Sequence, residues 1–396
     1  MPAETANRKS LPPVVRQFGV VSFLNDLASE MVYPLLPALI TSRLGAGALA
    51  LGALDGIAEA VAAGTKLMAG RVADNVRRRR PTVVWGYAVA AVARPIMAHA
   101  ASAWQVIALR AADRTGKGMR NPPRDAVIAD ASPPAIRGRA FGYHRSMDHA
   151  GAVAGPLIAW ILLSAAGMTP SQVIAWSIVP GALAVAVVVW ATRHIGKVRS
   201  ELGDRAAPES SSNTDEPAPA IHSSKSLLSL IMLFALARFP ETLFLLRLQD
   251  VGVAVALVPA LWAALHVVRA LGSYPGGWLS DRIGPRLTML LGWASYAIVC
   301  LGLALAARPL VATAWFLGFG AVTTLTESPE RAFVTGFTAR RRGTRFGIYH
   351  AGVGVAGLVG GLTFGAIYAA AGGVIALNLS AGLGAVLVAA GTFTRQ

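Results

Sequence analysis

Long apolar stretches separated by short polar loops run through almost the whole sequence. A helix of roughly 20 residues, at 1.5 Å per residue, spans the hydrocarbon core of a bilayer, and each stretch reaches about that length. Twelve such stretches are expected, at residues 17–40, 48–72, 81–100, 104–123, 140–166, 170–192, 227–246, 253–277, 285–306, 309–334, 345–371 and 373–394. The pattern predicts an all-α membrane protein with twelve transmembrane helices.

One polar segment interrupts the apolar pattern near the middle of the chain. Residues 193–225 are rich in Ser, Pro, Ala and charge and lack periodicity, which is typical of a flexible linker. The expected organisation is a tail at 1–16, a six-helix bundle at 17–192, the linker, and a second six-helix bundle at 226–396.

The fourth stretch carries more charge than lipid tolerates. Arg110, Asp113, Arg114 and Lys117 fall at i, i+3, i+4 and i+7, and Arg120 follows within one turn, so one helical face is charged. The stretch must nevertheless cross, because basic loops on both sides of 81–123 belong in the cytoplasm. Its charged face must therefore point inward, where it either fixes packing as a buried ion network or lines a translocation path.

Composition and charge agree with a multi-pass membrane protein. Hydrophobic residues make up 54% of the chain and charged residues 14%, while the net charge is +16. The basic residues gather in alternate loops, so the excess charge reflects membrane orientation, and no nucleic-acid partner is expected. We expect both termini in the cytoplasm of a bacterium, with the chain in the inner membrane as a monomer. Disulfides cannot hold the fold, since Cys300 is the single cysteine.

The two halves are related by sequence as well as by helix count. The run Gly70 to Asp74 matches Gly277 to Asp281, and 137–142 matches 342–347 at nearly the same offset. Parallel duplication of a six-helix unit is typical of transporters whose halves rock about a site near mid-membrane. The alignment sets Arg120 opposite Glu327 and Glu30 opposite Glu241, so we expect these pairs to flank a central cavity.

The repeated loop resembles a motif of the major facilitator superfamily, G-x-L-A-D-R-x-G-R-[RK]. The second copy follows it closely, whereas the first copy has Asn75 and Arg77 where the pattern has Arg and Gly. The residues that carry the resemblance are Gly70, Val72, Ala73, Asp74, Gly277, Leu279, Ser280, Asp281, Arg282, Gly284 and Arg286. The resemblance implies the major facilitator fold, with two pseudo-symmetric six-helix bundles. It also implies that the motif's Asp latches helix ends in the outward-open state, with Arg139 or Arg137 as the partner of Asp74.

The fifth stretch contains GAVAGP, which is similar to the G-x-x-x-G-P signature of proton-antiport exporters. Gly151 and Gly155 allow close helix approach, and Pro156 frees a carbonyl, so a bend is expected there. Ala159 replaces a glycine of the signature, and ordinary tight packing remains the alternative.

Carboxylates in the apolar stretches are candidates for proton coupling. Asp26 and Glu30 share a helical face, and two neighbouring carboxylates in a partly desolvated site can exchange a proton near neutral pH. Asp55 and Glu59 either act in the same way or pair with Lys66 and the fourth stretch. Glu241 is the counterpart in the second half.

Further charged and histidine side chains are candidates for the substrate cavity. Four pairings are expected within single helices: His144 with Asp148, Arg145 with His149, Arg238 with Glu241, and Glu327 with Arg331. A metal site at His144, Asp148 and His149 is a rival interpretation, but Arg145 and Arg120 argue against it, so neither a metal nor a cofactor is expected. The cavity candidates are Arg110, Asp113, Arg114, Lys117, Arg120, His144, Asp148, Arg238, His266, Glu327 and His350.

These features favour a secondary transporter that moves a small solute by alternating access. Proton-coupled efflux is the main hypothesis, and proton-coupled uptake of an anionic or zwitterionic solute is the alternative. An intramembrane enzyme acting on lipid is less favoured, because of the two-half repeat and because no G-x-S-x-G nucleophile motif is present.

Overall fold

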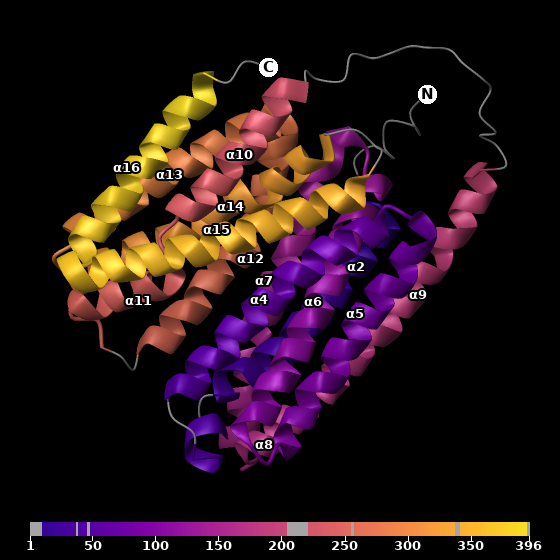
Figure 1. Ribbon diagram of the computed structural model, residues 1–396, viewed down its shortest axis with the longest axis horizontal. Coiled ribbons are helices and arrows are strands. Elements are labelled where there is room, and N and C mark those ends of the chain that lie inside the picture. The colour runs from indigo at the N-terminus through magenta and orange to yellow at the C-terminus, as the bar shows by residue number, and fades with distance from the viewer. Residues whose placement is uncertain are drawn as a thin grey trace.

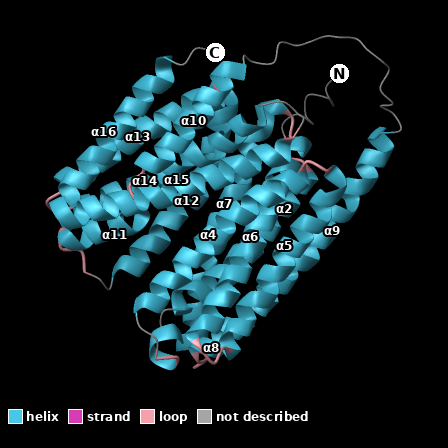
Figure 2. Cartoon of the chain, viewed as in Figure 1, coloured by secondary structure: helices cyan, strands magenta, loops and turns pink. Residues whose placement is uncertain are grey.

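The computed structural model describes residues 10–36, 39–45, 48–203, 221–254, 257–336 and 341–393. This described part is helical and contains no strand (Figure 2). The N-terminal half comprises α2 (Pro13–Val32), η1 (Tyr33–Leu35), η2 (Leu39–Arg43), α4 (Ala48–Ala73), α5 (Val76–Ile96), η3 (Met97–His99), α6 (Ala103–Ala131), η4 (Pro134–Ile136), α7 (Arg137–Ser164), α8 (Pro170–Trp176) and α9 (Ile178–Gly203). The C-terminal half comprises α10 (Ile221–Ala237), α11 (Glu241–Asp250), α12 (Val258–Ile283), α13 (Pro285–Leu305), α14 (Pro309–Gly336), α15 (Arg342–Ala371) and α16 (Gly373–Phe393).

Each of the twelve apolar stretches corresponds to helix in the described residues. The seventh stretch is broken into α10 and α11 at 238–240. Pro240 explains this break, because a proline lacks the amide hydrogen and its ring clashes with the preceding turn. Helix also enters the expected linker from both sides, since α9 continues to Gly203 and α10 begins at Ile221. Residues 204–220 lie outside the described residues.

Within the described residues, seven helical stretches are long and apolar enough to span a bilayer, judged by length and composition. They are Pro134–Ser164, Pro170–Arg193, Leu227–Asp250, Pro285–Leu305, Pro309–Gly336, Arg342–Ala371 and Gly373–Phe393. Helix α6 is absent from this set. This absence agrees with the charged face predicted for it from the sequence.

The two halves meet at one end and diverge toward the other (Figure 1). Helix α7 packs along α12, and α4 packs along α15. Glycines permit these contacts: a Cβ on Gly277 would stand 2.1 Å from the carbonyl oxygen of Gly138, and one on Gly70 would stand 2.7 Å from that of Gly343. We call the end marked by these four glycines the closed end and the opposite one the open end.

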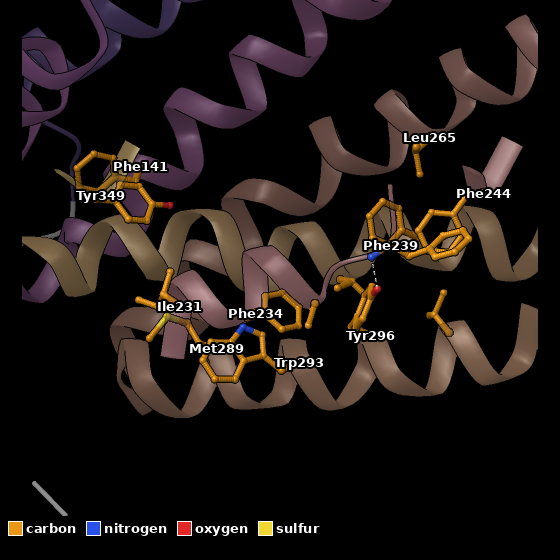
Figure 3. Packing of buried hydrophobic residues seen from close by; sticks show 14 of the residues in the cluster. Phe141, Ile231, Phe234, Phe239, Phe244, Leu265, Met289, Trp293, Tyr296 and Tyr349 are labelled. Atoms are coloured by element: carbon orange, nitrogen blue, oxygen red, sulfur yellow. Dashed lines mark hydrogen bonds between the residues drawn. The ribbon is translucent and has the colours of Figure 1, made fainter. Parts of the chain in front are cut away.

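The core of the C-terminal half is aromatic (Figure 3). Phe234 stacks on Trp293 with ring centroids 5.0 Å apart. The hydroxyl of Tyr296 accepts a hydrogen bond from the backbone N–H of Phe239 at 2.6 Å, and Ser380 Oγ donates to Ala237 O at 2.7 Å. These bonds satisfy the backbone at the break between α10 and α11, which fixes the position of Arg238.

Candidate functional site between the two bundles

The charged face of α6 begins with a closed ion network. Asp113 is 1% exposed and Arg110 is 2% exposed. The Asp113 carboxylate accepts from Arg94 Nε at 2.8 Å and from Arg110 Nη1 at 3.3 Å. The Arg110 guanidinium also lies 4.7 Å from the ring centroid of Tyr33. At these residues the structure matches the packing interpretation of the charged face.

One turn further along α6, the charges lack such partners. Arg114 and Lys117 are partly exposed, and no carboxylate of the described residues lies within 4 Å of either. Lys117 is near enough to Asp26 and Glu59 for electrostatic interaction, and Glu30 interacts with Arg114 and Lys117 in the same way. Two cations and three carboxylates from α2, α4 and α6 therefore surround partly exposed space.

The carboxylates predicted to carry protons differ in what surrounds them. Asp26 and Glu30 are both partly exposed, and Asp26 accepts from the Asn25 amide at 2.8 Å. Glu59 is exposed and interacts electrostatically with Lys66, without a salt bridge among the described residues. The side chain of Asp55 lies outside the described residues.

Arg120 and Glu327, which the repeat aligns, have different surroundings. Arg120 is 3% exposed and lies over the ring of Tyr87, 4.7 Å from its centroid, within the N-terminal half. Glu327 Oε2 instead accepts from Arg145 Nε at 2.5 Å, across the interface between the halves. The Arg145 guanidinium also donates to Asp148 at 2.5 Å, so it bridges carboxylates on both sides.

The predicted pairing of Glu327 with Arg331 is therefore wrong. Arg331 Nε lies 3.6 Å from the Asp125 carboxylate on α6, which also contacts His350 Nε2 at 2.7 Å. Both contacts join the halves. Glu327, Arg331 and His350 thus have polar partners on helices of the other half.

The histidines of α7 point in two directions. His144 does approach Asp148, with Nδ1 and Oδ2 3.9 Å apart, and Ser22 Oγ contacts both residues. The predicted Arg145 and His149 pair is wrong, because His149 Nδ1 lies 3.2 Å from His266 Nδ1 on α12. His144, Asp148 and His149 thus do not converge, and the described residues contain no group of three or more His, Cys, Asp or Glu side chains placed to hold a metal.

Glu241 forms its salt bridge with Arg269 and not with Arg238, although Arg238 is near enough to Glu241 for electrostatic interaction. Both oxygens of Glu241 accept from Arg269 on α12, at 2.8 and 3.1 Å. Pro240 breaks the helix between Arg238 and Glu241, so the i, i+3 geometry that the pairing needed is lost. Arg269 was not a predicted site residue, although a lone arginine in an apolar stretch was a visible signal.

Each motif carboxylate caps a helix of the opposite half. Asp281 accepts from the backbone N–H groups of Gly138 and Arg139 at 2.7 and 3.0 Å, and from Arg139 Nε at 3.1 Å. Asp74 accepts from the N–H of Thr344 at 3.0 Å and from its hydroxyl. A carboxylate is stabilised by the free N–H groups and the positive dipole at a helix N-terminus.

The partner predicted for Asp74 was consequently wrong. Arg139 pairs with Asp281, and Arg137 Nε donates to the carbonyl oxygen of Ser132 at 3.2 Å. Arg282 of the second motif copy lies over the ring of Trp278, with its Cζ atom 3.8 Å from the ring centroid.

The glycines of GAVAGP pack tightly against α2. A Cβ on Gly151 would stand 2.4 Å from Phe23 O, and one on Gly155 would stand 2.7 Å from Leu27 O. Helix α7 continues through Pro156 without interruption. The close-packing interpretation accounts for these glycines, whereas an export role for the signature remains a prediction.

Comparison with known proteins identifies the class to which this fold and site belong. The family model described as Major Facilitator Superfamily matches residues 18–322. The chain belongs to the major facilitator superfamily, as its repeated loop motif suggested. It is a membrane transporter of that family.

Two relatives are similar over most of their length and a third over one third of it. An uncharacterized MFS-type transporter of Methanocaldococcus jannaschii is 28% identical over 373 residues, which cover 91% of this chain and 90% of the relative. An uncharacterized protein of Mycobacterium tuberculosis is 30% identical over 359 residues, covering 89% and 86% of the two chains. The multidrug resistance protein MdtH of Yersinia pestis is 32% identical over 133 residues, 33% of each chain.

Solved structures share the fold. The human organic anion transporter MFSD10 superposes with a TM-score of 0.70 at 16% identity, covering 95% of this chain and 99% of that one. The transporter FucP in its outward conformation gives a TM-score of 0.71 at 14% identity, covering 96% and 98%. These likenesses confirm the predicted fold of two six-helix bundles.

Proposed function

We propose that this protein is a secondary active transporter that moves a small anionic or zwitterionic solute by alternating access, coupled to protons and working in efflux. The observation that carries the proposal is the position of Arg114 and Lys117. Both are partly exposed cations without an ion-pair partner among the described residues, and both lie near carboxylates of α2 and α4. Unpaired charge in a membrane protein is costly, so its retention favours a role in binding.

The proposed state is outward-open, in a bacterial inner membrane with both termini in the cytoplasm. The closed end then faces the cytoplasm, because it holds the basic residues 77–80 at the start of α5 and the positive-inside rule places such residues there. The two interhalf caps at Asp74 and Asp281 support this assignment. Rocking of the halves would break these caps and expose the same charges to the cytoplasm.

Asp26 and Glu30 are the proposed proton carriers. They lie beside Lys117 and Arg114, so the arrival of a proton or of an anion changes the charge balance of one shared site. Competition of this kind couples two ligands without direct contact between them. FucP, which shares the fold, is a fucose:proton symporter, and the relative MdtH is a multidrug resistance protein. The first is in line with proton coupling and the second with efflux, and uptake remains the alternative.

Substrate and direction can be tested in two steps. Growth inhibition by organic acids, oxyanions and drugs, with and without expression, selects a solute. Proteoliposomes with an imposed pH gradient then report solute flux and proton movement. We expect exchange of solute for protons, a loss of solute flux in Lys117→Gln, and unchanged flux in the matched control Arg308→Gln, whose side chain is exposed in a loop.

Glu30→Gln separates coupling from binding. We expect this variant to retain solute exchange while losing solute-linked proton movement. Proton movement equal to that of the wild type would remove Glu30 from the mechanism. Lipid turnover by the purified protein without any gradient would favour the enzyme hypothesis instead.

A further inference from the structure

The contact between α7 and α12 follows a regular antiparallel register. Starting from the closed end, Gly138 meets Gly277, Gly142 meets Ser273, Ser146 donates to Ala270 O, and His149 meets His266. Each turn forward on α7 is matched by one turn back on α12. The histidine pair is the member of this series that lies nearest the open end.

The two Nδ1 atoms are separated by about the distance that two ligands of one metal ion have. Their Nδ1 atoms are 3.2 Å apart, their ring centroids are 5.3 Å apart, and the ring planes meet at 48°. Two imidazole nitrogens bound at about 2.0–2.1 Å to one tetrahedral zinc ion lie roughly 3.3 Å apart. A metal ion can therefore replace the hydrogen shared by the two nitrogens with little movement of either helix.

The charges around the histidine pair are balanced. Arg145 and Arg269 are the nearest cations, but Arg145 is held by Glu327 and Arg269 is held by both oxygens of Glu241. Trp262 also lies beside the pair, and its ring meets that of His266 edge-on with centroids 5.2 Å apart. The electrostatic objection to a cation at this place is therefore removed by the ion pairs.

We propose that His149 and His266 bind a divalent transition-metal ion such as Zn²⁺ or Ni²⁺, with water completing the coordination. Neutral imidazole is a common ligand for both ions. The bound ion joins one helix of each half, so it holds the closed end shut and stops the halves from rocking. This site is separate from the charged face of α6 and does not depend on which solute is moved.

The first test measures binding to the purified full-length chain. Isothermal titration with Zn²⁺ should give one equivalent bound with the wild type and none with His149→Ala or His266→Ala. His99→Ala is the matched control, because His99 is exposed in η3, away from the α7 and α12 contact, and it should bind as the wild type does. Unchanged binding in both α7 and α12 variants, or no binding by the wild type, would overturn the proposal.

A second measurement guards against variants that bind nothing because they misfold. Zn²⁺ should raise the thermal unfolding temperature of the wild type and of His99→Ala, since a ligand that binds only the folded state stabilises it. The same ion should leave the unfolding temperatures of well-folded His149→Ala and His266→Ala unchanged. A rise in those variants would show that the stabilising ion binds elsewhere.

The consequence for rocking is tested by transport. Zn²⁺ should block solute flux in wild-type proteoliposomes, and a chelator should restore it, whereas flux in His149→Ala should resist the ion. Sensitivity of His149→Ala equal to that of the wild type would contradict the proposed link between the halves. If no solute is moved at all, the proposed function fails while the binding measurement still decides the metal site.

Discussion

The two halves share a fold but fill their interiors with different chemistry. In the N-terminal half, helix α6 buries Asp113 between two guanidinium groups. In the C-terminal half, the corresponding space is packed by rings, among them Phe234, Trp293 and Tyr296. Buried ion networks are a weak source of stability, while aromatic packing is a strong one. We therefore expect the aromatic core of the C-terminal half to contribute more to stability than the charged core around Asp113 does.

The largest effect should come from breaking the charged core. Asp113→Asn leaves Arg94 and Arg110 buried without a counter-ion, and removing one partner of a buried pair costs about 3–5 kcal/mol of unfolding free energy. Denaturant unfolding of the protein in detergent micelles measures this loss of unfolding free energy. The double variant Arg94→Gln with Asp113→Asn should lose less than the two single variants together, because it removes both members of one pair. Strict additivity would mean that the two residues do not act as a pair.

The contact between the two halves at the closed end should be destabilised more by added side-chain volume than by loss of a charge. Gly277→Ala would place a Cβ 2.1 Å from Gly138 O, and overpacking of this kind costs about 1–3 kcal/mol. This cost applies only while the closed end is packed together. The equilibrium between this conformation and the one in which the closed end has opened should therefore shift by roughly 5- to 150-fold. Spin labels on cysteines at Arg78 and Ile283, both exposed near the closed end, measure the separation of the halves.

The spin-label measurement is not disturbed by the native cysteine, and the chain offers a matched control glycine. The native Cys300 is buried and should not take the label. Gly382→Ala is the control, since nothing lies within 4 Å of a Cβ built at that position of α16. A distance distribution for Gly277→Ala that matches this control would contradict the assignment of Gly138 and Gly277 to the closing contact.

Loss of a single oxygen atom should destabilise the aromatic core of the C-terminal half. Tyr296→Phe leaves the Phe239 N–H without its acceptor at the break between α10 and α11, and an unsatisfied buried donor costs about 1–3 kcal/mol. Tyr274→Phe, at a site that is 39% exposed, should change stability by less than about 0.5 kcal/mol. Thermal unfolding compares the two. Equal losses would imply that the Tyr296 hydroxyl does not hold the break.

The sequence predicted the helices well and the partners of their charges poorly. Apolar length and loop charge are local properties, so twelve helices in two related halves could be read from the pattern. Ion pairs were expected at i, i+3 and i, i+4, yet Arg145 reaches Glu327 and Arg139 reaches Asp281 across the interface. Such pairings depend on how bundles dock, which spacing along one helix does not encode.

Some of the missed features did have a signal in the sequence. Pro240 lies between Arg238 and Glu241, and a proline inside a helical pattern predicts the break that separates them. Nothing in the pattern marked Tyr296 as the residue that accepts from the broken backbone, because its place depends on packing between α10 and α13.

The smallest expected difference lies between the two caps that the repeat makes equivalent. Asp281 uses one oxygen for Gly138 N and the other for the N–H and Nε of Arg139. Among the described residues, Asp74 accepts hydrogen bonds from the N–H and the hydroxyl of Thr344. In Asp281→Asn the new amide group must face one of these fixed donors. In Asp74→Asn the hydroxyl of Thr344 can rotate and accept from the amide.

Asp281→Asn should therefore weaken the closed end by about 1 kcal/mol more than Asp74→Asn, which is the order of a lost charge at a helix N-terminus. The spin-label separation at Arg78 and Ile283 measures this difference under the conditions used for Gly277→Ala. Equal shifts in the two variants would mean that the caps are equivalent and that Arg139 adds nothing to the second one. A larger shift for Asp281→Asn would locate the stronger hold of the closed end at α7 and α12, the same helices that carry His149 and His266.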